Sequence, residues 1–352
     1  MKSLYSSHQS FFPFSRGRLG SSKWLSAICA IVTINSVSLF AQTKSFEFLN
    51  LPGNATLSAL GGTNVSSTNH NINFFQSNPA LTVDTTDGWG SASYLFYFAG
   101  IGMANFSYQP KFDKIGALTF GVQHLGYGQI QGYDLIGTST GKFGSGETAL
   151  FIAKSHRINA FRLGANVKGV FSNITGYRAS AIMLDLGGVY IHPHQDLNIG
   201  LVIKNIGFLL TEYSETSTTR LPFDIQAGVS FKPEQMPVRF SFAAHHLTSF
   251  DGSYFNPSDI NDKLTTLDKV VRHFSFGGEL LVHKNINLLI GYNFLKHQEL
   301  KLGNAAGGSG LSVGMLAKVK SVELSVSRTG YVTDGSYQFS ISANIKKIIT
   351  SI

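Results

Sequence analysis

Apolar and polar residues alternate with a period of two through most of the chain. In the run 161–171, for example, Leu163 and Val167 share one face while Asn166 and Lys168 share the other. Successive side chains of an extended strand point to opposite faces, so this period predicts strands that are apolar on one side. The pattern therefore predicts an all-β fold.

Fourteen such runs follow one another from residue 89 onward. Most are close to the length, about 9–11 residues, that a tilted strand needs to cross the hydrocarbon core of a membrane. An even number of antiparallel strands can close into a barrel, so we predict a 14-stranded antiparallel transmembrane β-barrel over residues 89–352. The runs are 89–97, 102–108, 116–125, 147–156, 161–171, 179–192, 197–205, 223–231, 238–247, 272–282, 286–293, 311–319, 322–328 and 337–345.

The connections between the runs differ in length according to their position. Those after even-numbered runs are short, and four of those after odd-numbered runs are long. Short periplasmic turns and long outer loops are typical of outer-membrane barrels. A soluble β-sandwich also alternates and is the alternative, but it gives no reason for this asymmetry. The long connections are 126–146, 206–222, 248–271 and 294–310, while 98–101, 172–178 and 329–336 fit the rule less well.

The composition favours the membrane interpretation. Charged residues make up 14% of the chain, against about 25% in ordinary soluble domains. The polar strand faces, which mix Gly, Ser, Asn and charged residues, suit a wet lumen, and the apolar faces suit contact with lipid. The basic residues are not clustered, so the net charge of +8 predicts no nucleic-acid partner.

Residues 1–41 are expected to be a signal peptide. A basic stretch ends at Lys23, an apolar stretch covers 24–40, and cleavage would follow Ala41. A membrane anchor is the alternative. However, a membrane-spanning helix needs about 20 mostly apolar residues, and the stretch 24–40 is shorter than that and contains several polar residues. Removal of the segment would also remove Cys29, the only cysteine, and with it any disulfide.

The segment between this signal and the first strand, residues 42–88, lacks the period of two. Gly61-Gly62 and Pro79 interrupt regular structure within it, and it is too apolar to extend freely into water. We expect a hatch that plugs the barrel or lines its inner wall. The alternative is a periplasmic extension packed on the rim.

Candidate catalytic and metal-binding motifs occur in unsuitable contexts. Ser139 lies in an expected loop and Ser312 opens an expected strand, whereas a nucleophile elbow needs a strand before the serine and a helix after it. His192-Pro193-His194 offers two ligands in an expected turn, fewer than a zinc site needs. His245 and His246 would point to opposite faces of a strand. We therefore expect no enzyme activity, no metal and no cofactor.

A set of short motifs runs through the chain from residue 46 onward. The set comprises Phe46-Glu47-Phe48-Leu49-Asn50-Leu51-Pro52, Ser58-Ala59-Leu60-Gly61-Gly62, Ser77-Asn78-Pro79-Ala80-Leu81, Phe112-Asp113-Lys114-Ile115-Gly116, Gly126-Tyr127-Gly128, Lys204-Asn205-Ile206-Gly207, Leu221-Pro222-Phe223-Asp224-Ile225 and His245-His246-Leu247. The Asn-Pro-Ala triplet alone recurs across barrels similar to fatty-acid transporters, and the ordered set is more specific. In this order the motifs resemble the PorQ family of type IX secretion proteins.

The resemblance implies a fold similar to the fatty-acid-transporter barrels, with Asn78, Pro79 and Ala80 as the hatch motif. It also implies a place in the cell outer membrane of Bacteroidetes-type bacteria, in the attachment complex of type IX secretion. The implied partners are membrane lipid, a PorZ-like surface protein, a sortase-like protease and a PorV-like barrel. Such a complex processes secreted cargo and joins it to lipopolysaccharide, and the PorQ member anchors the surface protein.

Two functions remain open for such a barrel. The leading hypothesis is that the long connections dock a surface partner, with Phe250, Tyr254 and Phe255 as a candidate docking loop, because aromatic side chains often anchor interfaces. The opposing interpretation is that these side chains fold back onto the rim. The alternative function is transport of a hydrophobic small molecule, against which the mostly polar inward faces argue.

Overall fold

The computed structural model describes residues 44–68, 71–214, 219–248, 265–300, 307–332 and 334–350. The expected signal peptide, residues 1–41, lies outside these ranges, and so do Phe250, Tyr254 and Phe255 of the candidate docking loop. None of the helices in the described ranges is long and apolar enough to span a bilayer.

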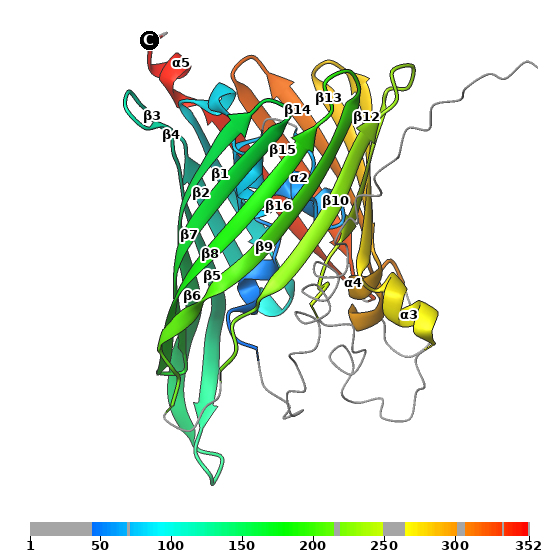
Figure 1. The fold of residues 1–352 in the computed structure, drawn as a ribbon. Coiled ribbons are helices and arrows are strands. Elements are labelled where there is room, and N and C mark those ends of the chain that lie inside the picture. The colour runs from blue at the N-terminus through cyan, green and yellow to red at the C-terminus, as the bar shows by residue number, and fades with distance from the viewer. Residues whose placement is uncertain are drawn as a thin grey trace, which may run out of the picture. The chain divides into compact units, whose positions relative to one another are not determined.

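Fourteen antiparallel strands close into a barrel (Figure 1). β1 and β16 form the closing seam, which runs from Trp89 opposite Asn344 to Phe96 opposite Tyr337. A closed sheet has no unpaired edge, as β-structure in lipid requires. The barrel strands are β1 (Trp89–Phe96), β2 (Gly102–Tyr108), β5 (Thr119–Tyr133), β6 (Ser139–Ile158), β7 (Phe161–Ile174), β8 (Tyr177–Ile191), β9 (Asp196–Thr211), β10 (Asp224–Lys232), β11 (Val238–Ala244), β12 (Phe274–His283), β13 (Ile286–Asn293), β14 (Leu311–Val319), β15 (Val322–Gly330) and β16 (Gly335–Asn344).

The fourteen strands predicted from the alternation are confirmed. Each predicted run coincides with a barrel strand, and the period of two sorts side chains between the two surfaces. On β7, Leu163 and Val167 are exposed on the outside, whereas Asn166 and Lys168 are buried inside. The outside thus carries a broad apolar surface, and the polar faces line the lumen.

The connection 126–146 is largely strand, which corrects the predicted loop. β5 continues to Tyr133 and β6 begins at Ser139, so their outer parts form a hairpin that protrudes beyond the other strands (Figure 1). The first six residues of β6 are exposed whichever face they lie on. Because neither face of this ribbon is buried, its sequence does not alternate between apolar and polar residues, and the pattern gives no sign of a strand.

β9 also runs past its predicted end, to Thr211. Lys204 and Asn205 are both buried inside, Asn205 has a left-handed backbone (φ 61°), and the register against β8 shifts beside them. A bulge of this kind turns two successive residues toward the same face. Before the bulge the even-numbered residues of β9 face inward, and at Asn205 the inward positions change to odd-numbered residues. The predicted strand ends at this change.

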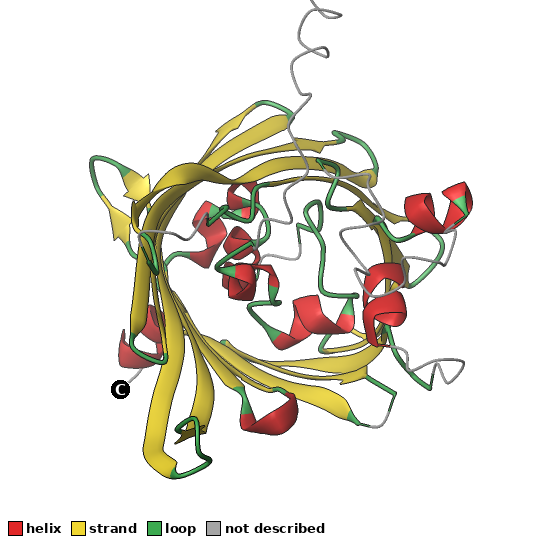
Figure 2. Cartoon of the chain, turned by 90° about the horizontal axis from the view of Figure 1, so that it is seen from below, coloured by secondary structure: helices red, strands yellow, loops and turns green. Residues whose placement is uncertain are grey.

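Short helices lie before β1 and inside the ring of strands, as expected of a hatch (Figure 2). α2 contacts β13–β16 on one side of the lumen, and η3 contacts β6–β8 on the other. The hatch elements are η1 (Glu47–Asn50), α2 (Ala55–Ala59), η2 (Ile72–Gln76), η3 (Pro79–Leu81) and η4 (Asp84–Thr86). The connections carry η5 (Phe98–Gly100), the hairpin of β3 (Lys111–Phe112) and β4 (Gly116–Ala117), α3 (Thr266–Val271) and α4 (Phe294–Leu300), and α5 (Ile345–Thr350) follows β16.

The described chain enters the barrel from the end that carries the long connections. Lys44 forms a bridge with Arg220, which lies between β9 and β10, and the Ser45 amide donates to the Arg220 carbonyl oxygen over 3.1 Å. α5 lies at the opposite end (Figure 1). The hatch therefore traverses the lumen before the first strand begins.

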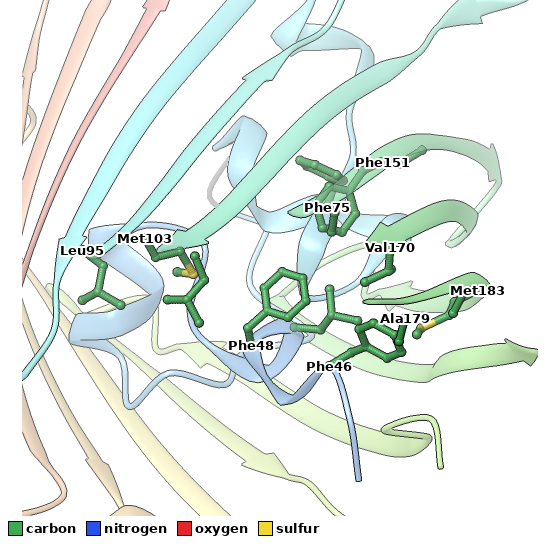
Figure 3. Close-up of a cluster of buried hydrophobic side chains, with 14 residues drawn as sticks. Phe46, Phe48, Phe75, Leu95, Met103, Phe151, Val170, Ala179 and Met183 are labelled. Atoms are coloured by element: carbon green, nitrogen blue, oxygen red, sulfur yellow. The ribbon is translucent and has the colours of Figure 1, made fainter. Parts of the chain in front are cut away.

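An apolar cluster joins the hatch to one sector of the wall (Figure 3). Phe46, Phe48 and Phe75 of the hatch pack against inward side chains of β1, β2 and β5–β8. The Phe75 and Phe151 ring centroids lie 5.8 Å apart in an edge-to-face arrangement. Burial of each such ring stabilises the fold by about 1.5–3 kcal/mol, so this cluster is a main attachment of the hatch.

Candidate functional site

The hatch motif Asn78, Pro79 and Ala80 sits against the inner wall at β7 and β8. The Asn78 side chain is fully buried, and its Oδ1 accepts from the Ala80 amide over 2.9 Å, which caps η3. Its Nδ2 donates to the Val65 carbonyl oxygen over 2.8 Å and lies 3.3 Å from that of Gly188. Asn78 thus links two parts of the hatch to each other and to the wall.

Two wall glycines make room for this motif. Gly164 of β7 and Gly187 of β8 are register partners and both face the lumen. A Cβ atom on Gly187 would lie 1.9 Å from Asn78 Oδ1, and one on Gly164 would lie 2.4 Å from the Ala80 nitrogen. Neither glycine was predicted from the sequence to belong to the site, although glycines at inward positions of two adjacent strands are a signal of close backbone approach.

Replacing Asn78 with alanine is expected to destabilise the protein by about 2–3 kcal/mol. The change removes the cap of η3 and leaves the Val65 carbonyl and the Ala80 amide without this partner in a buried place. The measurement is urea unfolding of the purified chain in detergent, followed by the fluorescence of Trp89. Asn173→Ala, on the exposed outer face of β7, is the control and should change stability by less than about 0.5 kcal/mol.

Inward polar side chains of the wall form hydrogen bonds with backbone amides and carbonyls of the hatch at several points. Gln338 Nε2 donates to the Pro52 carbonyl oxygen over 3.0 Å, and Ser340 Oγ accepts from the Ala55 amide over 2.8 Å. Gln123 Nε2 and Asn293 Nδ2 donate to the hatch carbonyls of Phe48 and Gly61. Buried irregular backbone needs such partners, so much of the polar lumen serves to hold the hatch.

An ion pair is buried in the wall behind the hatch. Lys168 Nζ of β7 lies 2.6 Å from Asp185 Oδ1 of β8, and their side chains are only 2% and 1% exposed. Asp185 also accepts from Asn166 Nδ2 over 3.1 Å and from the Asn205 amide over 2.8 Å. The carboxylate therefore has the several partners that a buried charge requires.

Asn205 extends this hydrogen-bond network toward the end of the barrel that carries the long connections. Its Oδ1 accepts from Lys168 Nζ, and its Nδ2 donates to the Pro222 carbonyl oxygen over 2.6 Å. Asn205 and Pro222 belong to two of the motifs that resemble the PorQ family. The structure brings them together at the bulge of β9, where they fix the connection that precedes β10.

A small cavity of about 190 Å³ lies between the hatch and the long connections. Its lining includes Tyr97, His245, Lys296 and Tyr331, which lie just beyond the outer ends of their strands or in α4. Burial lowers the pKa of Lys296 and holds that of His245 well below its usual range. His245 is therefore neutral at neutral pH, and the cavity has the character of a small polar site.

The prediction that His245 and His246 point to opposite faces is wrong. β11 ends at Ala244, and His246 has a left-handed backbone (φ 56°), so the two Nδ1 atoms lie 2.7 Å apart. In the described ranges, no group of three or more His, Cys, Asp or Glu side chains could hold a metal ion.

The other candidate motifs lie in ordinary strand and turn positions. Ser312 faces the lumen on β14, and its Oγ is 3.1 Å from Thr329 Oγ1. Ser139 begins β6, with its Oγ 2.5 Å from Gln131 Nε2. His192 Nδ1 accepts from the Gln195 amide over 3.0 Å, which closes the turn before β9.

The protruding hairpin of β5 and β6 presents apolar side chains to solvent. Tyr133, Leu135 and Ile136 lie at its tip, and Leu135 is fully exposed. Asp134 Oδ1 accepts from the amides of Ile136 and Thr138 over 3.0 and 2.8 Å, so the tip has a defined turn. The hairpin belongs to the connection 126–146, one of the long connections named as docking surfaces from the sequence.

Comparisons with known proteins find similarity to solved structures alone. No family model matches the chain, and no curated protein matches it. Similar solved structures include a FadL homologue from Pseudomonas aeruginosa (9% identical, TM-score 0.47, covering 83% of this chain and 98% of that one). A mutant of the monoaromatic hydrocarbon channel TodX (14%, 0.45, 84% and 98%) and the KdgM porin (7%, 0.35, 72% and 98%) are also similar.

Proposed function

We propose that this chain is an outer-membrane barrel closed by its own hatch, with the long connections outside the cell. The closed sheet and the apolar outer surface support residence in a bilayer. The asymmetry of the connections supports the orientation, because outer-membrane barrels have short periplasmic turns and long outer loops. The wall–hatch hydrogen bonds and the buried Lys168–Asp185 pair suit a rigid plug better than a wide channel.

We propose further that the barrel anchors a partner protein at the cell surface. The observation that carries this proposal is the protruding hairpin with Tyr133, Leu135 and Ile136 exposed at its tip. Contiguous exposed apolar side chains often mark an interaction site, and the turn that Asp134 holds at the tip limits the entropy lost when a partner binds. Phe250, Tyr254 and Phe255 are a second docking element, proposed from the sequence.

The resemblance to the PorQ family gives this proposal its specific form. The partner would be a PorZ-like surface protein, beside a sortase-like protease and a PorV-like barrel in a type IX attachment complex. The motifs that carry the resemblance include Asn78 and Asn205, which hold the hatch and the β9 bulge. These structural roles support the view that this chain and the PorQ family have the same kind of plugged barrel. The identity of the proposed complex rests on the resemblance.

A pull-down from solubilised outer membranes tests the anchoring function. The tagged chain should recover a large surface protein, and Leu135→Ser with Ile136→Ser should lower that recovery at least about tenfold, as loss of interface hot spots does. The control is Phe112→Ser with Ile115→Ser, two exposed apolar residues in the short hairpin at the opposite end. Equal recovery from both variants, or recovery of lipid with no protein, contradicts the proposal.

The second candidate is a channel for a hydrophobic small molecule. The observation that favours it is the apolar cluster of Phe46, Phe48 and Phe75 against the wall (Figure 3), since displacement of these rings would expose an apolar path. A deletion strain distinguishes the two candidates. Normal attachment of secreted cargo together with impaired uptake of long-chain fatty acids supports the channel, and the reverse result supports anchoring.

A further inference from the structure

The outer face of β5–β9 changes from apolar to polar along one cross-strand row. Five outward residues of neighbouring strands are register partners in turn: His124, Thr148, Phe171, Ser180 and Thr211. His124 Nδ1 lies 2.9 Å from Thr148 Oγ1, and Ser180 Oγ lies 2.7 Å from Thr211 Oγ1. We call this row the outer ledge.

The next outward row toward the middle of the barrel is apolar. It contains Val122, Leu150, Ile182 and Phe208, all exposed, with Gly169 between Leu150 and Ile182. Aliphatic and aromatic side chains thus give way, within a single step of two residues, to hydroxyl and imidazole groups at four of the five positions, with Phe171 as the exception. The outer ledge therefore marks the boundary between the hydrocarbon-facing band and the headgroup level.

A hollow of about 550 Å³ lies at this boundary. Its lining includes Gly144 and Gly146 on the outer face of β6, which carry no side chains, and a Cβ atom on Gly144 would meet nothing within 4 Å. His124, Phe171 and Arg178 surround it. The hollow opens outward from the wall, since most of its lining residues occupy outward strand positions.

The cationic group in the lining of the hollow is Arg178. Arg178 is exposed and forms none of the ion pairs between described residues. Glu212, next to Thr211 of the outer ledge, also forms none of them. A guanidinium presents a fork of N–H donors that matches a phosphate, and Asn173, Ser180 and Thr211 add neutral donors nearby.

We propose that the outer ledge and its hollow bind the phosphorylated headgroup of a lipid in the outer leaflet. Arg178 would pair with the phosphate, the hydroxyl and amide groups would meet the polar remainder, and the acyl chains would lie on the apolar row below. The inference rests on the proposed outer-membrane orientation. A partner protein would need no apolar band directly beneath a cationic hollow, and a lipid needs both.

Native mass spectrometry of the purified full chain in detergent tests this site, with lipid A and its dephosphorylated form as probes. The unmodified chain should retain phosphorylated lipid A preferentially. Arg178→Gln should weaken its binding about fivefold, the effect of one exposed charge pair. Gly144→Leu, which adds a side chain to the lining of the hollow at a position where a Cβ atom meets nothing within 4 Å, should weaken the binding of both forms. Lys154→Gln, an exposed outward cation at the other end of β6, is the control.

Three results of the lipid-binding measurement would overturn the proposal. They are equal retention of both forms by the unmodified chain, binding unchanged by Arg178→Gln and Gly144→Leu, and an equal loss from Lys154→Gln. Lost partner recovery in Arg178→Gln with lipid binding intact would instead assign the hollow to a protein, which also overturns it. These outcomes leave the anchoring function standing. Absence of the chain from the outer-membrane fraction would overturn the proposed function itself.

Discussion

Asp185→Asn is expected to destabilise the barrel by about 3–5 kcal/mol, the usual effect of breaking a buried ion pair from one side. The substitution keeps the shape of the side chain but removes the charge that faces Lys168 Nζ at 2.6 Å. The ammonium group is then left buried inside the barrel without the counter-charge of Asp185. Asn205 loses an anionic acceptor for its amide at the same time.

Urea unfolding in detergent, followed by Trp89 fluorescence, measures this loss. The control is Asp196→Asn, because Asp196 is 39% exposed and its partner Arg239 keeps Glu279 at 2.8 Å. An exposed pair of this kind contributes about 0–1 kcal/mol. If Asp185→Asn shifts the unfolding midpoint no more than Asp196→Asn, the buried pair does not hold the wall as argued.

Gly164→Val is expected to expel the hatch from its seat on β7 and β8. The new Cβ atom would lie 2.4 Å from the Ala80 nitrogen and from the Pro79 carbonyl carbon. Both are backbone atoms of a helical turn held by Asn78, so neither can move without unseating the motif. Overpacking of this severity costs about 3 kcal/mol or more, and the displaced segment should leave the lumen open.

Two measurements read out this change. Residues 44–86 should become accessible to protease in detergent, and planar bilayers containing the variant should show ion currents that the unmodified chain lacks. Gly169→Val is the matched control, since it makes the same change on the same strand but points outward, where the nearest atom lies 3.8 Å away. A closed, protease-resistant Gly164→Val variant would show that the hatch seat tolerates the side chain.

The strands could be predicted because each of them separates a lipid-facing surface from a polar lumen. Apolar and polar residues therefore alternate wherever a strand has one face toward lipid and the other toward the lumen. This alternation is absent at the tip of the β5–β6 hairpin, where both faces are exposed, and it is inverted at Asn205, where the bulge turns two residues inward. These are the places where the predicted strands stop short.

The sequence of the hatch has no periodic pattern that predicts its structure, and only its short motifs set it apart. Its helices are too short for a helical period, and its fold depends on partners that lie far along the chain, such as Gln338 for Pro52 and Asn293 for Gly61. Asn78 was singled out from the sequence, but its wall partners Gly164 and Gly187 were not. Likewise, the Lys168–Asp185 pair depends on the register between β7 and β8, which the sequence pattern alone does not determine.

The β1–β16 seam has a consequence for the order in which the molecule folds. It joins Trp89 to Asn344, near the two ends of the barrel region, so it carries the greatest loop-closure entropy of any strand pair in the ring. The hatch precedes β1 in the chain and touches strands on opposite sides of the lumen. Zipping of the sheet from hairpin to hairpin can thus begin with the hatch already resting on β6–β8, and the last pairing to form would enclose it.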